Sequence, residues 1–443
     1  MISTTMTSTL RAARIWILAA LVCGPAAAQV AVGWKDKEAT TAKLHVGLPA
    51  PALEAITRWA PFCEARGYRM DLDAQGRVLV VTRAKRGRTK ETLRIVGAAQ
   101  TWFDGVLPPV PRASAEPAAA PGGASPGGPA PGPRPAPLPE DPEDPPAPRP
   151  SSGTGVGPRP GGAEAPAPKT AWGSGSGAPD SQTATLFLLH DEVDHAAFLD
   201  HLEASVPHLQ GWIATARKQT GLTLEDPLVG AFVENASGQE EWNGDHEILN
   251  RVVQLLVLRR FGQQPNWLVQ GLAWEAEMAH DGSVYCFPYR DGFVFATEHT
   301  SWPSDLRIAF KDRSGRPLAV EELARWPRGV WDGEAAPVAW GFVRFLCEAQ
   351  KTKDKALSRL LEEFRRIRDE QDREPTGPTT WRRIEGWSMD PKEQEAALTA
   401  VFGPDVWKRA TAALRTLKDV AGSRSADTKA KSRARDSSGS ARG

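Results

Sequence analysis

The chain has 443 residues, and its 54 lysines and arginines are balanced by 54 aspartates and glutamates, so its formal net charge at pH 7 is zero. This length gives room for two or three domains. A balanced charge leaves no overall basic footprint of the kind that nucleic-acid-binding proteins carry, so we expect no nucleic-acid partner. Many of the 38 prolines and 40 glycines fall within one stretch, which indicates a linker between folded parts.

Residues 1–28 have the pattern of a secretory signal peptide. Arg11 and Arg14 supply a basic start, residues 15–22 form an apolar run too short to span a bilayer, and three alanines at 26–28 provide a cleavage site. We therefore expect an exported protein, periplasmic or extracellular, with no transmembrane span in the mature chain.

Residues 30–108 are expected to form a small α-β-β-α domain. Apolar residues at helical spacing predict helices over 51–66 and 89–106. Between them, the aliphatic runs 68–72 and 78–82 flank a turn sequence that contains glycine, and they predict a hairpin. No set of residues in this unit points to catalysis.

Two segments lack the apolar residues needed to offset the entropy of ordering. Residues 109–182 are rich in proline, glycine, alanine and serine, and they predict a disordered linker. Residues 419–443 are polar and mildly basic, and they predict a disordered tail. The second folded unit is therefore expected to be 183–418.

The second unit begins with strands and continues with helices, which favours an α+β fold. Residues 185–189 and 228–233 predict two buried strands, and 194–219 predicts a long helix that Pro207 kinks or splits. Further helices are predicted in the second half, over 335–346, 357–367 and 392–417.

The most informative stretch is 241–277, which predicts two consecutive helices. The second begins with Trp267-Leu-Val-Gln270-Gly-Leu-Ala273 and continues to Glu277. A helix with HExxH followed by a helix with WLxEGxAxxxE is the scaffold of gluzincin metallopeptidases. Residues 183–418 resemble the secreted bacterial peptidase-MA-like branch of that clan. The resemblance implies a gluzincin-like domain with a small sheet and a mainly helical C-terminal part.

A peptidase zinc site needs three protein ligands and one open position for water. Two registers bring the first helix onto HExxH. One places His246, Glu247 and Asn250 at the motif positions, and the other places Asn250, Arg251 and Gln254 there. We favour the second, because the run 256–262 then matches the VLxRxFG-like run that follows HExxH in the family.

In both registers Gln270 replaces the glutamate that would be the third zinc ligand. Amide oxygens are weak zinc donors, and an arginine in place of the general base repels a divalent cation. We therefore expect no bound metal and no cofactor, and we assign no catalytic residue in this interpretation. The degenerate cleft is expected to contain His246, Asn250, Arg251, Gln254, Gln270 and Glu277.

Three functions follow from these patterns. The first is a non-catalytic, metallopeptidase-like protein that binds a peptide, a protein or an envelope polymer through the degenerate cleft. The second is a zinc peptidase with Glu247 as its base and with His246 joined by an unusual ligand such as Glu275, Glu277 or His280. The third is an envelope scaffold in which two folded units on a tether make bivalent contact. A simpler explanation for Glu247 is that an acidic residue in the first turn of a helix interacts favourably with the helix dipole.

Overall fold

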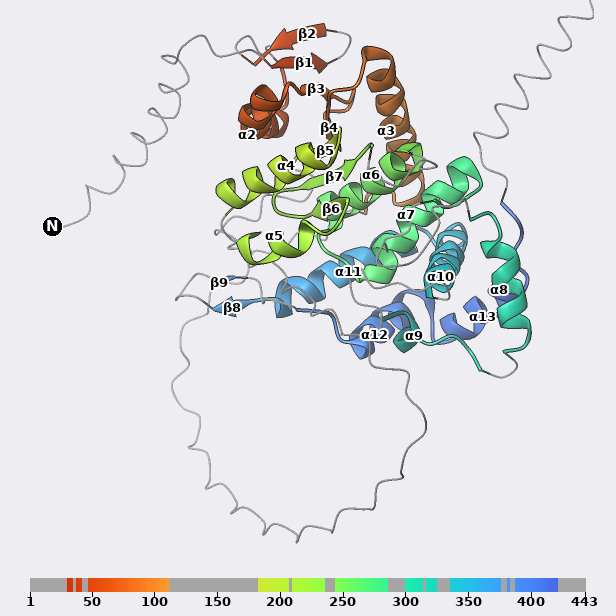
Figure 1. The fold of residues 1–443 in the computed structure, drawn as a ribbon. Coiled ribbons are helices and arrows are strands. Elements are labelled where there is room, and N and C mark those ends of the chain that lie inside the picture. Colours follow the sequence, from red (N-terminus) through yellow and green to blue (C-terminus); the bar gives the residue numbers. More distant parts are fainter. Residues whose placement is uncertain are drawn as a thin grey trace, which may run out of the picture. The chain divides into compact units, whose positions relative to one another are not determined.

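Figure 1 shows the fold in a computed structural model. The described residues are 30–34, 37–41, 47–110, 182–206, 209–235, 244–285, 299–313, 316–324, 335–375, 381–382 and 387–420. The expected signal peptide, nearly all of the expected linker, and the expected tail beyond residue 420 lie outside these residues. The described part is an α+β protein, as expected, with a mixed sheet and a larger number of helices.

The main sheet has seven strands in the order β2-β1-β3-β4-β5-β7-β6. The pairs β1–β3, β4–β5 and β5–β7 are parallel, and the pairs β1–β2, β3–β4 and β6–β7 are antiparallel. The predicted hairpin and the two predicted strands of the second unit are confirmed. The strands are β1 (Ala31–Trp34), β2 (Lys37–Thr40), β3 (Arg69–Leu72), β4 (Val78–Thr82), β5 (Ala184–Leu189), β6 (Gly221–Leu224) and β7 (Val229–Val233).

The sheet joins the two segments that the sequence presents as separate units. Strand β4, from the first segment, pairs in parallel with β5, from the second, and Val80 lies opposite Leu186. The aromatic core crosses the same boundary, because the Trp59 ring lies 4.9 Å from the Phe187 ring and 5.8 Å from the Phe198 ring. Residues 30–108 and 183–418 therefore share one sheet, and both contribute to the apolar cores packed on it.

A buried carboxylate also ties the two segments together. Asp194 is 1% exposed and accepts hydrogen bonds from the Tyr68 hydroxyl at 2.6 Å and from Arg83 at 3.1 Å. Arg66 donates to the same carboxylate through Nε at 2.9 Å. Because removal of a buried charge from its partners is costly, these contacts oppose separation of the two segments.

Helices cover both faces of the sheet (Figure 1). Side chains alternate along β4, so Val78 and Val80 pack into one core while Leu79 and Val81 pack into the other. The first core includes α3 and α6, and the second includes α2, α4 and α5. The bounds are α2 (Ala50–Arg66), α3 (Arg86–Val106), α4 (Glu192–Ser205), α5 (Gln210–Ala216) and α6 (Gly244–Phe261).

The remaining described helices form a mainly helical part that continues from α6 (Figure 1). They are α7 (Asn266–Asp281), α8 (Trp302–Lys311), α9 (Val320–Ala324), α10 (Ala335–Gln350), α11 (Ala356–Gln371), α12 (Pro391–Phe402) and α13 (Val406–Arg415). A short hairpin, β8 (Glu374–Pro375) with β9 (Trp381–Arg382), completes the described elements. No helix among the described residues is both long and apolar enough to cross a membrane.

Two predicted helices are each divided in the structure. The helix expected over 194–219 is two helices, α4 and α5, which end and begin on either side of Pro207. The helix expected over 392–417 is also two, α12 and α13, with Gly403 between them at φ +97°. Glycine adopts this left-handed conformation without the steric cost that a Cβ brings, so the division follows from the residue at that position.

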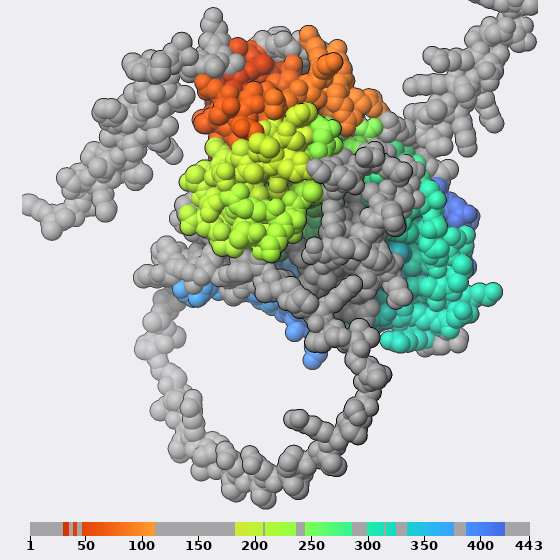
Figure 2. Space-filling model, in the orientation of Figure 1, coloured from red at the N-terminus to blue at the C-terminus, as the bar shows by residue number. Residues whose placement is uncertain are grey.

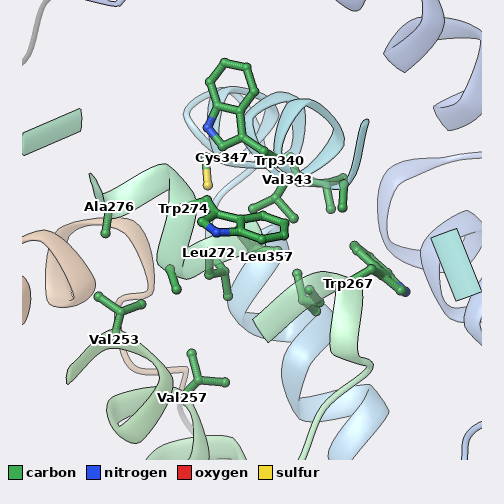
Figure 3. Packing of buried hydrophobic residues seen from close by; sticks show 14 of the residues in the cluster. Val253, Val257, Trp267, Leu272, Trp274, Ala276, Trp340, Val343, Cys347 and Leu357 are labelled. Carbon is green, nitrogen blue, oxygen red and sulfur yellow. The ribbon is translucent and has the colours of Figure 1, made fainter. Parts of the chain in front are cut away.

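Helix α7 packs closely on α10, and Gly271 permits the approach. A Cβ at position 271 would lie 2.5 Å from Cγ2 of Val343, which is too close for a carbon contact. Figure 3 shows Trp274 and Trp340 among the apolar side chains that fill this region. Both tryptophans are fully buried. The glycine of the WLxxGLA motif is therefore explained by helix packing, and the motif fixes the position of α7.

Candidate functional site

Helices α6 and α7 are consecutive and pack against each other. Residues of α6 that are one turn apart share a helix face, so several of them can contact α7 together. Helix α6 ends at Phe261, Gly262 follows it with φ +69°, and Pro265 precedes the first residue of α7. The short connection brings the polar positions of both helices into a single buried region.

The carboxylate of Glu277 lies at the centre of this region and is 0% exposed. Oε2 lies 2.9 Å from Nδ1 of His246 and accepts a hydrogen bond from the backbone N–H of Tyr285 at 2.9 Å. Oε1 accepts a hydrogen bond from Nδ2 of Asn250 at 2.6 Å. Burial raises the pKa of Glu277, while its hydrogen bond and its attraction to His246 oppose that rise.

Amide groups extend the network along α6. Nε2 of Gln254 donates to Oδ1 of Asn250 at 2.5 Å and to Oε1 of Gln270 at 3.3 Å. The favoured register puts these three residues at the metal-ligand positions, and in the structure their side chains lie together. Their amides are hydrogen-bonded to one another and carry no charge that would attract a metal ion.

Arg251 lies outside this network, although the sequence places it among the cleft residues. Its Nε donates to Oε1 of Glu247 at 2.7 Å, and its Nη1 donates to the hydroxyl of Thr223 on β6 at 2.9 Å. The reason is helical geometry, because positions 247 and 251 are rotated about 100° from the stripe that contains 246, 250 and 254. The Glu247 carboxylate is thus held toward the sheet by an ion pair.

Glu275 lies on the other side of α7, toward α10. Its carboxylate accepts hydrogen bonds from Nε1 of Trp340 at 2.9 Å and from Nη1 of Arg344 at 2.6 Å. The ligands suggested for the zinc alternative are therefore separated: Glu275 is hydrogen-bonded to side chains of α10, whereas Glu277 contacts His246. His280 contacts Asp281, with Nδ1 3.0 Å from Oδ1.

The His246 ring lies between two carboxylates of α7. Besides the contact with Glu277, its Nε2 lies 3.6 Å from Oδ2 of Asp281. The two carboxylates flank the ring and fix its orientation. Within the part of the chain that the structure describes, no group of three or more His, Cys, Asp or Glu side chains is placed to hold a metal ion.

The sequence did not point to Asp281, to Thr223 or to the Tyr285 backbone as partners in this region. Asp281 follows Glu277 by four residues, so helical spacing would have placed both carboxylates on one face of α7. No pattern in the neighbouring sequence indicates Thr223 or Tyr285, because only the tertiary fold brings each of them close to this region.

We expect the Glu275→Gln protein to differ from wild type in how its stability depends on pH. Burial raises the pKa of Glu275 to about 7, from an ordinary value of 4.5. Between these values the folded protein binds more protons than the unfolded chain, so the contribution of Glu275 to stability falls as the pH rises. As the pH rises from about 5 to about 8, the unfolding free energy of the variant should therefore increase relative to that of wild type by on the order of 2 kcal/mol.

Urea denaturation at several pH values measures this difference. A variant that follows wild type in parallel across the whole range would show that Glu275 is ionised in the folded protein even in mildly acidic solution.

Comparison of the chain with family models and with curated proteins gives no match. The residues and their geometry are therefore the basis of the function proposed below.

Proposed function

We propose that this protein is an exported, non-catalytic relative of gluzincin metallopeptidases that binds a peptide-like ligand at the degenerate site between α6 and α7. The observation that carries the proposal is the convergence of Asn250, Gln254 and Gln270. Three neutral amides lie together at the positions where the proposed relationship to peptidases would put the zinc ligands, and Gln254 donates to the other two. The three amides offer donors and acceptors for a peptide backbone, and none of the three brings a negative charge for a dication.

Gln254 is the member of this network through which a ligand would make contact. Its side chain is half-buried, whereas His246, Asn250 and Glu277 are buried almost completely. An extended peptide presents alternating N–H and C=O groups, and an amide side chain pairs with both. The proposed ligand is therefore a peptide segment of a protein or of an envelope polymer.

The first experiment is to measure the metal content of the untagged protein, residues 29–443, by elemental mass spectrometry after dialysis against trace zinc. We expect far less than one zinc per chain. About one zinc per chain, lost in the His246→Ala protein, would overturn the proposal and favour the zinc peptidase with Glu247 as its base.

The second experiment tests binding at the same site. Immobilised protein is exposed to a peptide mixture from digested casein, and the retained peptides are quantified by mass spectrometry. We expect Gln254→Arg to retain several-fold less, because a cation with a longer side chain blocks the site and cannot accept a hydrogen bond. The matched control is Gln75→Arg in the exposed β3–β4 turn. Equal loss in both variants would contradict binding at Gln254.

A further inference from the structure

A surface cavity of about 380 Å³ lies between α8 and α13, on a different part of the molecule from the α6–α7 site. Residues 304, 308 and 311 follow one another at steps of three and four, so they form a single stripe on α8. In Figure 2 the α8 segment, drawn in teal, lies on the visible surface. The cavity is lined by Ser304, Arg307, Ile308, Lys311 and Arg415.

Three of these five residues are cationic, and two of them have no carboxylate partner among the described residues. The Arg415 guanidinium donates to the backbone carbonyls of Phe310 at 2.9 Å and Arg313 at 2.8 Å, which fix its position without neutralising its charge. Lys311 is exposed and makes no ion pair within the described part of the chain. The cavity thus presents fixed positive charge in a chain whose net charge is zero.

The third cation, Arg307, is held by the end of the described chain. It donates to the carbonyl of Leu417 at 2.6 Å and to Oδ1 of Asp419 at 2.9 Å. The Asp419 side chain is 78% exposed, so this ion pair is screened by solvent and contributes little to stability. An incoming carboxylate would meet Arg307 already oriented toward the cavity.

Ile308 adds an apolar contact in the middle of the cations. It is 67% exposed, whereas Trp302, Leu306 and Phe310 on the same helix are buried. The inner face of α8 is therefore already packed, and Ile308 has no role in the core. A wholly polar anion, such as a phosphate polymer, would leave this side chain uncovered, whereas a peptide with an apolar residue between acidic ones would cover it.

We infer that the α8–α13 cavity is a docking site for an acidic peptide segment of another protein, with an apolar side chain seated on Ile308. Carboxylates of the segment pair with Lys311, Arg307 and Arg415. The positive charge of the cavity selects a negatively charged partner and speeds its association. The apolar contact with Ile308 favours this partner over wholly polar anions.

The test uses the full mature chain and a fluorescein-labelled peptide of repeated Glu-Glu-Leu triplets, with binding followed by fluorescence anisotropy. Two comparison peptides replace leucine with serine or glutamate with glutamine. We expect the Glu-Glu-Leu peptide to bind most tightly, and its affinity to fall as salt is added. Lys311→Glu and Ile308→Ser should each weaken binding by about fivefold, because one reverses a charge and the other removes the apolar contact.

The charge-matched control is Lys90→Glu, on an exposed position of α3. It should leave the affinity unchanged, and circular dichroism should show each variant folded. Equal weakening by Lys90→Glu would show that the peptide responds only to overall charge, and this would overturn the proposal. Tighter binding of polyphosphate or of the Glu-Glu-Ser peptide would overturn the peptide assignment. Neither result depends on the α6–α7 site. Peptide binding there is tested separately, by comparing Gln254→Arg with its control Gln75→Arg.

Discussion

The Glu277→Ala protein is expected to lose about 3–5 kcal/mol of unfolding free energy, among the largest losses that a single substitution in this chain would give. The carboxylate is fully buried and accepts hydrogen bonds from Asn250 and from the Tyr285 backbone, and it also contacts the His246 ring. Its removal leaves these groups buried without an acceptor. Guanidinium denaturation followed by tryptophan fluorescence measures the change.

Two comparison variants make this prediction specific. Glu277→Gln keeps one acceptor oxygen for Asn250 but turns an NH₂ group toward the other donors, so its loss should be smaller, about 1–2 kcal/mol. Glu64→Ala removes an exposed carboxylate from α2 and should change stability by less than about 0.5 kcal/mol. If Glu277→Ala were as stable as Glu64→Ala, the network between α6 and α7 would not be a structural centre.

The Trp59→Ala protein is the second variant with a large expected effect, about 3–5 kcal/mol. Trp59 is 2% exposed, packs against Phe187 and Phe198, and donates from Nε1 to the Thr185 hydroxyl at 3.1 Å. All three partners belong to the second sequence segment. The substitution therefore opens a cavity at the contact between the two segments and leaves one hydroxyl without its donor.

Hydrogen exchange measured by mass spectrometry would test whether the two segments respond together. In Trp59→Ala, amides of β3–β4 and of β5–β7 should lose protection to the same extent, because they belong to one sheet. Leu53→Ala is the matched control, since Leu53 lies on the same helix and is 41% exposed. Loss of protection in β3–β4 alone would mean that residues 30–108 are a domain of their own.

Much of the local structure could be predicted from the sequence, because it depends on local patterns. The aliphatic run of β4 and the glycine-containing turn before it predict the hairpin, and apolar spacing predicts the helices. Strands β1, β2 and β6 could not be predicted, because they lack a clear aliphatic run: Gly33 interrupts β1, β6 begins with Gly221, and Lys37–Thr40 has little apolar character. The pairing of β4 with β5 joins residues about a hundred positions apart, and no local pattern specifies it.

The candidate site shows the same division between local and tertiary information. Helical spacing puts positions 246, 250 and 254 on one face of α6, and the motif on α7 puts Gln270 opposite them. Asn250, Gln254 and Gln270 do meet in the structure, and His246 is linked to Asn250 through Glu277. The side of α7 on which Glu275 and Glu277 lie depends on how α10 packs against Gly271, which the motif does not reveal. Arg251 turned toward β6, a strand that the sequence analysis did not identify.

The parallel pairing of β4 with β5 has a consequence for how the chain can be divided. These neighbouring strands are far apart in the sequence, because α3 and the long segment after it separate them along the chain. A chain cut within that segment would yield two fragments, each with an exposed strand edge and half of an aromatic core. Such fragments are suited to complementation: produced separately, they should recover one folded particle only when mixed.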